Sequence, residues 1–487
     1  MTLEAYCWPA SVAPGEPVGL HVSTDVEAVD VLVAREGAAT DVVWRAGGVP
    51  ATQQDTPSDA AARGCRWSRT LQVPVDERWR SGYHAVTVVG GGQRADAFFV
   101  VRPSRSAPAP ILLALSMTTY HAYNDWGGPS LYTGGTRVSF ERPLPRGFLR
   151  KPEPAGRMMQ PGPDREAMGY RTWARPLGLS DWSGGAGWWN WERPFTRWAE
   201  ARGFELDVAV GVDLERHPDL LDGHRLLLSV GHDEYWSWGM RDAVDRFVGA
   251  GGNAAFLGGN TCFWQVRLDR DHRGMTCFKY RADEDPVLGT TDGRYLSGMW
   301  SDRRVGRPET TTIGLTFTRG GYSRYGLGAA DASGAYTVQR PAHWAFEGTG
   351  LRPGDPFGTR DAIVAYECDG CALEPGPGGL PVPTHADGAP DGLEVLATAP
   401  AHLWSRDEQP SRYASEPGDL EAVSASVFGD TSPEHLAELA EGHAVLGTFS
   451  RPGGGTVVNA GAIDWVLGLR DPVVERITAN VLQRLSS

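Results

Sequence analysis

Two short apolar runs in this chain each end in polar and glycine residues, and this pattern restricts the folds open to it. Residues 111–116 (Ile-Leu-Leu-Ala-Leu-Ser) lead into Met-Thr-Thr-Tyr-His-Ala-Tyr, and residues 225–230 lead into Gly-His-Asp-Glu-Tyr-Trp. A buried parallel strand has this form, because both of its faces are covered and its carboxyl end opens into a crevice. Ligands bind at that edge of an open α/β sheet. We therefore expect Tyr120 and the His-Asp-Glu triplet at 232–234 to share one site.

Strands and helices alternate around these two runs. The pattern predicts helices at 191–202, from Ser237 to the Gly-Gly pair at 251–252, and from Asp471 to 485. It predicts strands at 204–210, 226–230, 254–257 and 455–459. Such a rhythm is typical of a parallel sheet with right-handed crossovers. We interpret the Gly pairs at 251–252 and 258–259 as turns, because a phosphate-binding glycine motif is missing.

Two stretches of the chain depart from this alternating pattern. Residues 1–103 contain short, alternating β-type runs separated by Pro, Gly and Asp, which predicts an immunoglobulin-like β-sandwich. Residues 104–487 are expected to form an α/β catalytic domain, with a β-rich insertion at about 265–450 that is rich in Gly, Pro, Thr and Arg. The predicted fold class is therefore α/β with a preceding β-sandwich.

Charge and composition exclude several classes of protein. The 487 residues carry a net charge of −14, which argues against nucleic acid and anionic membranes as main partners. No apolar run reaches transmembrane length, and the first residues do not resemble a secretory signal, so a cytoplasmic protein is expected. Six scattered Cys do not form a disulfide framework, and the single CxxC of Cys368 and Cys371 is interpreted as a structural turn.

The polar residues after the two apolar runs suggest a metal site. Tyr120, Tyr123, Glu234 and Asn260 supply oxygen donors, and charge-dense oxygens favour a hard cation. Two phenolates and one carboxylate would neutralise three positive charges, which favours ferric iron over zinc. His-x-Glu is also common in satisfied polar clusters, and the adjacent carboxyls at 233–234 would suit a metal-free general base.

Several longer segments, in the same order along the chain, resemble the large subunit of N,N-dimethylformamidase. The first reads Tyr-His-Ala-Tyr-Asn-Asp-Trp-Gly-Gly at 120–128, and another reads Gly-His-Asp-Glu-Tyr-Trp-Ser at 231–237. Similar segments lie at 138–143, 251–265, 365–369 and 458–465. The likeness extends more weakly into the N-terminal residues, so it covers most of the chain.

The resemblance implies a mononuclear Fe(III) site, with two tyrosine ligands and one glutamate, in a glutamine-amidotransferase-like α/β fold. Tyr120 matches the first tyrosine ligand and Glu234 matches the glutamate. The second tyrosine is less clear, because the spacing drifts after residue 138. Tyr170 is the first choice, with Tyr132 and Tyr123 as alternatives.

The resemblance also implies an amide hydrolase acting on a small-molecule amide. Glu367 would be the general base, His232 and Asn260 would orient the substrate or stabilise the oxyanion, and Ser116 would be a positioning hydroxyl. A nucleophilic Ser116 is disfavoured, because the strained Gly-x-Ser-x-Gly turn is missing. The Trp-rich segment at 173–198 is either a mobile lid or a packed loop.

Some alternatives remain open at this point. A separate small subunit, or none, and a homo-oligomer are all compatible with the sequence. So are a non-hydrolytic iron enzyme of specialised metabolism and a metal-containing binding protein on the same fold.

Overall fold

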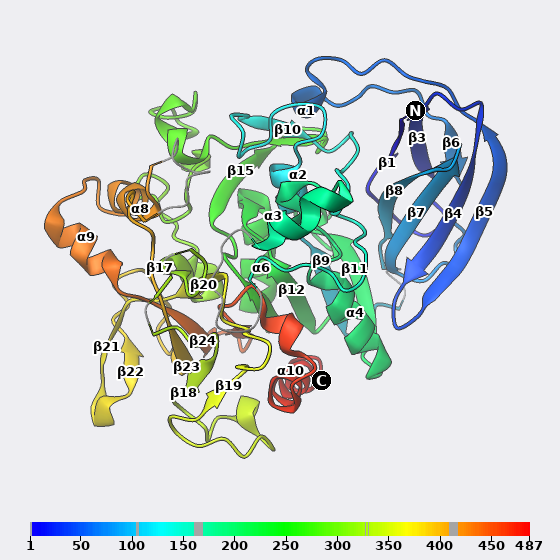
Figure 1. Ribbon diagram of the computed structural model, residues 1–487. Coiled ribbons are helices and arrows are strands. Elements are labelled where there is room, and N and C mark those ends of the chain that lie inside the picture. Colours follow the sequence, from blue (N-terminus) through cyan, green and yellow to red (C-terminus); the bar gives the residue numbers. More distant parts are fainter. Residues whose placement is uncertain (1, 104–106, 160–168, 327, 330, 409–416) are drawn as a thin grey trace. The chain divides into compact units, whose positions relative to one another are not determined.

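The computed structural model describes residues 2–103, 107–159, 169–326, 328–329, 331–408 and 417–487 (Figure 1). The chain forms two compact units. The first comprises Met1–Ala155, Ala174–His224 and Leu268–Thr276, and the second comprises Gly156–Trp173, Arg225–Arg267 and Cys277–Ser487. The domain boundary predicted at residue 104 falls at residues 104–106, outside the described part of the chain.

Two β-sheets near the N-terminus of the first unit share one apolar core. A three-stranded sheet has the order β1-β3-β6, and a five-stranded sheet has the order β2-β8-β7-β4-β5. Val18 and Leu20 of the first sheet and Val86 and Val88 of the second belong to a single cluster of buried side chains. The strands are β1 (Leu3–Trp8), β2 (Ser11–Val12), β3 (Val18–Thr24), β4 (Ala28–Glu36), β5 (Thr40–Pro50), β6 (Leu71–Val73), β7 (Gly82–Gly90) and β8 (Gln93–Val101).

Residues 66–73 are one of the β-type runs expected to form strands in the N-terminal region, but only their end does so, as β6. Arg66 has a left-handed φ of 55°, which breaks extended backbone. Trp67 packs with Tyr6 and Cys65 in a separate small cluster instead of continuing the strand. The tertiary contacts of the tryptophan therefore outweigh the local β pattern at this position.

The rest of the first unit contains the first of the two apolar runs. β9 (Ile111–Leu115) pairs in parallel with β11 (Leu206–Val210), and every residue of both strands is buried. Ser116 is the N-cap residue of α2 (Met117–Tyr123). Further elements are α1 (Ala60–Arg63), β10 (Arg137–Ser139), α4 (Glu192–Ala201), α5 (Asp213–Arg216) and β16 (Gly274–Thr276), of which β10 and β16 pair antiparallel.

The second unit contains a mixed sheet. β12 (Leu226–His232), β14 (Asn253–Gly259) and β25 (Thr456–Asn459) are parallel neighbours, as predicted. β24 (Gly442–Ser450) pairs antiparallel with β25, and β23 (Glu394–Ala401), β18 (Tyr336–Val338) and β19 (Pro356–Phe357) continue the sheet. Part of the region predicted as an insertion therefore extends the sheet.

Smaller strand pairs and helices complete the second unit. β13 (Tyr235–Ser237) pairs with β15 (Trp264–Leu268), and β17 (Thr316–Tyr322) pairs with β20 (Glu367–Gly370). The other elements are α3 (Gly169–Ala174), α6 (Trp238–Gly249), α7 (Thr310–Ile313), β21 (Leu373–Pro375), β22 (Pro381–Pro383), α8 (Asp419–Val427), α9 (Pro433–Ala440) and α10 (Pro472–Leu485).

The predicted helix caps are confirmed. The Ser237 hydroxyl accepts the Met240 backbone N–H at 3.2 Å, and Asp471 accepts the Val473 N–H at 2.8 Å. Gly251, with φ of 98°, follows the end of α6 as predicted.

The turn predicted at 258–259 is wrong, because both glycines lie inside β14. A Cβ atom on Gly258 would stand 2.1 Å from a backbone oxygen of β12. Glycine therefore allows the two strands to approach closely at this position.

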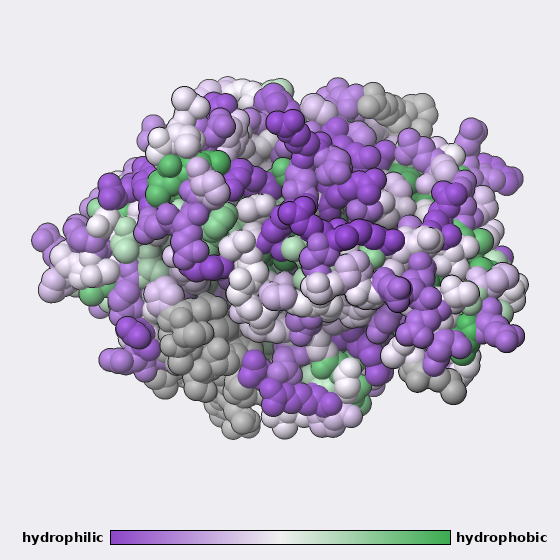
Figure 2. Space-filling model, turned by 90° about the horizontal axis from the view of Figure 1, so that it is seen from above, coloured by the Kyte–Doolittle hydropathy of each residue, from purple (hydrophilic) through white to green (hydrophobic). Residues whose placement is uncertain are grey.

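The fold is mixed α/β with several sheets, and its visible surface is polar. Figure 2 shows a largely hydrophilic face on which hydrophobic residues are scattered. Among the described helices, none is long and apolar enough to cross a membrane. The cytoplasmic location stays a prediction.

Candidate active site

Three strand termini of the second unit bring polar side chains together. His232 ends β12, Asn260 directly follows β14, and Glu367 begins β20. The His232 Nε2 atom lies 3.0 Å from Glu367 Oε2 and 3.3 Å from Glu234 Oε2. Asn260 Nδ2 donates to the same Glu367 Oε2 at 3.3 Å. Four of the predicted site residues therefore form one cluster, although Asn260 and Glu367 are 107 positions apart in the sequence.

The two adjacent carboxyls at 233–234 have different surroundings. Glu234 Oε1 accepts the Trp264 indole N–H at 2.7 Å, whereas Asp233 Oδ2 accepts the Ser229 hydroxyl at 2.7 Å. Burial raises the pKa of Asp233 to about 6. The side chains of Asp233 and Glu234 thus contact different partners. The Glu234–His232–Glu367 arrangement is therefore better suited to a paired acid/base site than Asp233 and Glu234 are.

Aromatic side chains lie on one side of the cluster. Tyr366 makes an edge-to-face contact with His232, with ring centroids 6.4 Å apart. Tyr322 is the strand partner of Glu367 and stacks on Trp404 at 3.7 Å. The four residues of the cluster are themselves 1–5% exposed. Water is largely excluded here, so charges and hydrogen bonds act more strongly than at the surface.

Lys279 is a cation near this cluster that the sequence reasoning missed. It is buried, and its Nζ lies 5.2 Å from the ring centre of Trp264, the residue that donates to Glu234. The backbone of Lys279 is left-handed, with φ of 52°. No local motif marks this lysine, because its position depends on a kinked turn and on Trp264.

A second polar cluster lies in the first unit. The Tyr120 phenol donates to Glu192 Oε1 at 2.6 Å, and the Ser116 hydroxyl donates to the same oxygen at 2.9 Å. Burial raises the pKa of Glu192 to about 7. The sequence reasoning missed Glu192, since a glutamate in the first turn of a helix is ordinarily explained by the helix dipole.

The candidates for the second tyrosine ligand are placed differently. Tyr170 lies in α3 of the second unit, and it is buried. Tyr132 and Tyr123 lie in the first unit, where the Tyr132 hydroxyl donates to the Tyr123 hydroxyl at 2.8 Å. None of these contacts decides between the three tyrosines, and Tyr170 stays the prediction.

The Trp-rich segment is packed in its described contacts. Trp188 is 1% exposed and stacks on Tyr83 with ring centroids 4.0 Å apart. The Arg193 guanidinium lies 3.6 Å from the centre of the Trp189 ring. These contacts favour the packed loop over the mobile lid.

The residues expected to bind iron fit the metal chemically. Tyr120, Tyr170 and Glu234 are each buried and present hard oxygen donors, which suits a trivalent cation. The Glu192 carboxyl accepts the hydrogen bond of the Tyr120 phenol, and an acceptor in that place can take the proton that a phenol loses when it binds a metal. Among the described residues, His, Cys, Asp and Glu alone provide no group of three that could hold a metal ion.

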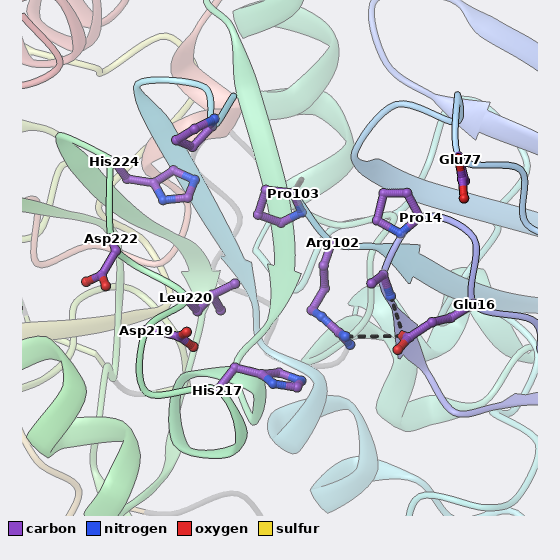
Figure 3. Close-up of a pocket in the computed structure, with 12 residues that line it drawn as sticks. Pro14, Glu16, Glu77, Arg102, Pro103, His217, Asp219, Leu220, Asp222 and His224 are labelled. Carbon is purple, nitrogen blue, oxygen red and sulfur yellow. Dashed lines mark hydrogen bonds and ion pairs between the residues drawn. The ribbon is translucent and has the colours of Figure 1, made fainter. Parts of the chain in front are cut away.

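A pocket of about 790 Å³ in the first unit has a different lining (Figure 3). Arg102, Glu16 and His217 face it, and Arg102 Nη2 donates to Glu16 at 3.4 Å. None of the predicted site residues lines this pocket. Its volume therefore does not identify it as the active site.

Comparison with known proteins supports the family resemblance indicated by the segments at 120–128 and 231–237. A family model described as "N,N-dimethylformamidase beta subunit-like, C-terminal" matches residues 29–479. The N,N-dimethylformamidase beta subunit of Alcaligenes sp. is 25% identical over 458 residues, and that of Paracoccus aminophilus is 25% identical over 456 residues. Each match covers 86% of this chain and 54% of the relative, so the chain spans about half the length of the curated relatives it matches. Because the family model covers most of its residues, the chain belongs to the N,N-dimethylformamidase beta subunit-like family.

Proposed function

We propose that this protein hydrolyses small amides in an iron-dependent reaction related to that of N,N-dimethylformamidase. The observation that carries the proposal is the buried contact of Glu367 with both His232 and Asn260. A carboxylate flanked by two hydrogen-bonding side chains, in a place poor in water, is suited to moving a proton during hydrolysis. The names of the two relatives support an amide as substrate.

The residues of the cluster divide the work by their chemistry. Glu367 would take a proton from the attacking water and return it to the departing amine, so that the amide C–N bond breaks and a carboxylic acid and an amine form. His232 and Asn260 would orient the substrate or donate hydrogen bonds to the oxyanion. Ser116 would position Glu192 and Tyr120, because its hydroxyl binds the same carboxylate oxygen as the phenol.

Tyr120, Tyr170 and Glu234 are the proposed ligands of a single Fe(III) ion. Bound there, the ion would supply Lewis-acid chemistry, which polarises a carbonyl or makes a water more acidic. The Trp264 indole holds Glu234 in place through its hydrogen bond, as outer partners of metal ligands commonly do.

The proposal extends to architecture and partners. The parallel strands β12, β14 and β25 support a glutamine-amidotransferase-like sheet, and the two N-terminal sheets with their common core support an immunoglobulin-like sandwich. Both relatives are named as beta subunits, which supports a complex with a separate small subunit.

The purified protein tests the proposal directly. Metal analysis should find about one iron per chain, and the protein should be coloured by charge transfer from tyrosinate to iron. It should release amine from N,N-dimethylformamide or another member of a panel of small amides without consuming oxygen. Oxygen uptake coupled to turnover would instead indicate a non-hydrolytic iron enzyme. An iron-loaded protein that turns over no amide would indicate a metal-containing binding protein.

A further inference from the structure

Asp369 has a fully buried carboxyl group that holds the backbone next to the candidate site. Its Oδ1 accepts the backbone N–H of Asn260 at 2.8 Å, and its Oδ2 accepts the backbone N–H of Thr261 at 3.1 Å. Its own N–H donates to the Gly461 carbonyl at 3.0 Å. One residue therefore ties the exit of β14 to β20 and to the segment that follows β25.

The backbone that Asp369 holds is in an unusual conformation. Asn260 has φ of 49°, in the left-handed region that residues with a Cβ rarely occupy. Asparagine tolerates this region better than most residues, but the conformation still needs support from its surroundings. The two hydrogen bonds to Asp369 give that support.

The conformation of Asn260 decides where its amide points. Nδ2 donates to Glu367 Oε2 at 3.3 Å. A carboxylate only accepts hydrogen bonds, so the nitrogen end of the amide must face Glu367. Oδ1 is buried, and among the described residues it has no hydrogen-bond partner. This oxygen remains available to a hydrogen of the attacking water or of the substrate.

The junction around Asp369 leaves little room for adjustment. A Cβ atom on Gly259 would lie 2.7 Å from the Glu367 carbonyl oxygen and from the Ile463 nitrogen. The Ile463 N–H donates to that same carbonyl at 3.2 Å. The backbones that carry Asn260 and Glu367 are therefore packed directly against each other, and a change at Asp369 reaches both.

We propose that Asp369 is a positioning residue, which holds Asn260 so that its amide bridges Glu367 and the reacting water or substrate. The inference rests on the proposed hydrolase function and adds a residue to it. Asp369 acts only through Asn260 and does not itself touch the reacting atoms.

A double-mutant cycle with Asp369→Asn and Asn260→Ala tests the proposal, with amine release from the best amide of the panel as the readout. Asp369→Asn should lower kcat by about 10–100-fold, the usual effect of removing a supporting hydrogen-bond partner, and change KM little. Because Asp369 acts through Asn260, the double variant should be within about twofold of Asn260→Ala alone. If the double variant instead loses kcat by the product of the two single losses, the proposal is overturned. A wild-type kcat in Asp369→Asn would also overturn it.

Asp387 provides the matched control. It also accepts two backbone N–H groups, from Ala372 at 2.7 Å and from Ala389 at 3.1 Å, but it does not contact the cluster. Asp387→Asn should keep the wild-type kcat. Equal losses of kcat in the Asp387 and Asp369 variants would show that Asp369 is merely structural.

Crystal structures of the wild type and of Asp369→Asn separate this inference from the proposed function. If the wild type hydrolyses no amide, the proposed function fails, and the structures alone decide on the positioning. In the variant, Asn260 should leave its left-handed φ, and Nδ2 should lose its contact with Glu367. An unchanged Asn260 would overturn the inference. If Asp369→Asn does not fold, Asp369→Ser, which keeps one acceptor oxygen, takes its place in both experiments.

Discussion

The N-terminal two-sheet core and the strand-end cluster of the second unit are both buried, but they are built from opposite residue types. The core of the two sheets consists of apolar side chains such as Val33, Val86 and Phe99. The cluster and its support consist of polar side chains that are each at most 5% exposed, namely His232, Glu234, Asn260, Glu367 and Asp369. Burial alone stabilises the first region, whereas the second is stable only where each polar atom finds a partner.

Two buried acids of the second unit show that the burial of carboxyl groups is unfavourable. Burial raises the pKa of Asp369 to about 8 and that of Glu309, another acid of the second unit, to about 7. Both acids are therefore harder to ionise in the folded protein than in the unfolded chain. The second unit thus retains groups that oppose its stability near neutral pH. Such groups are common at functional sites and also occur in structural networks.

The largest expected effect distinguishes the proposed role of Glu367, a general base, from that of Glu234, an iron ligand. Glu367→Ala should retain iron and lower kcat by about 10²–10⁴-fold, because a general base is removed. Glu234→Ala should lose iron as well as activity. Metal analysis and amine release on the same preparations check both. Iron lost from the Glu367 variant and retained in the Glu234 variant would reverse the proposed roles.

The apolar core should respond in stability and not in chemistry. Phe99→Ala, at a fully buried position, should lower the free energy of unfolding by about 3–5 kcal/mol. The folded fraction should keep the wild-type KM and kcat at low temperature. Denaturant unfolding and amine release measure the two quantities. Val89→Ala, at a 40% exposed position of the same unit, is the control and should change little.

The close packing at the strand ends makes a third test. Gly259→Ala should cost about 1–3 kcal/mol of stability, because the added methyl group would overlap the Glu367 and Ile463 backbones. It should also lower kcat, since it displaces Glu367. Gly249→Ala is the matched control, because a Cβ there meets nothing within 4 Å. A Gly259 variant as stable and active as that control would show that the junction can relax.

The smallest effect concerns pH. The raised pKa of Glu309 means that the unfolded chain releases this proton at lower pH than the folded protein does. The contribution of Glu309 to the free energy of unfolding should therefore fall as the pH rises from about 4.5 to 7. Glu309→Gln should make the dependence shallower, by on the order of 1–3 kcal/mol across this range. Urea unfolding at several pH values measures it.

Exposed Glu27→Gln controls for the loss of a carboxyl group and should leave the pH dependence unchanged. An equal change in both variants would assign the effect to overall charge instead of burial.

The parallel strands and their helices were predictable because their signals are local. The apolar runs at β9, β12, β14 and β25 and the caps Ser237 and Asp471 depend on neighbours a few residues away. The antiparallel extension by β23 and β18 was not predicted, because strand pairing between distant segments has no local signature. Lys279 likewise has no local signature, because its place beside Trp264 depends on tertiary contacts.

The order of the residues is enough to place His232 and Asn260 at the ends of buried strands, since runs of apolar residues specify those strands locally. Only the tertiary structure could bring Glu367 to them and put Asp369 under the Asn260 backbone, because these contacts join segments more than 100 residues apart. Contacts over such separations depend on how whole strands pair and pack, and no stretch of neighbouring residues encodes them.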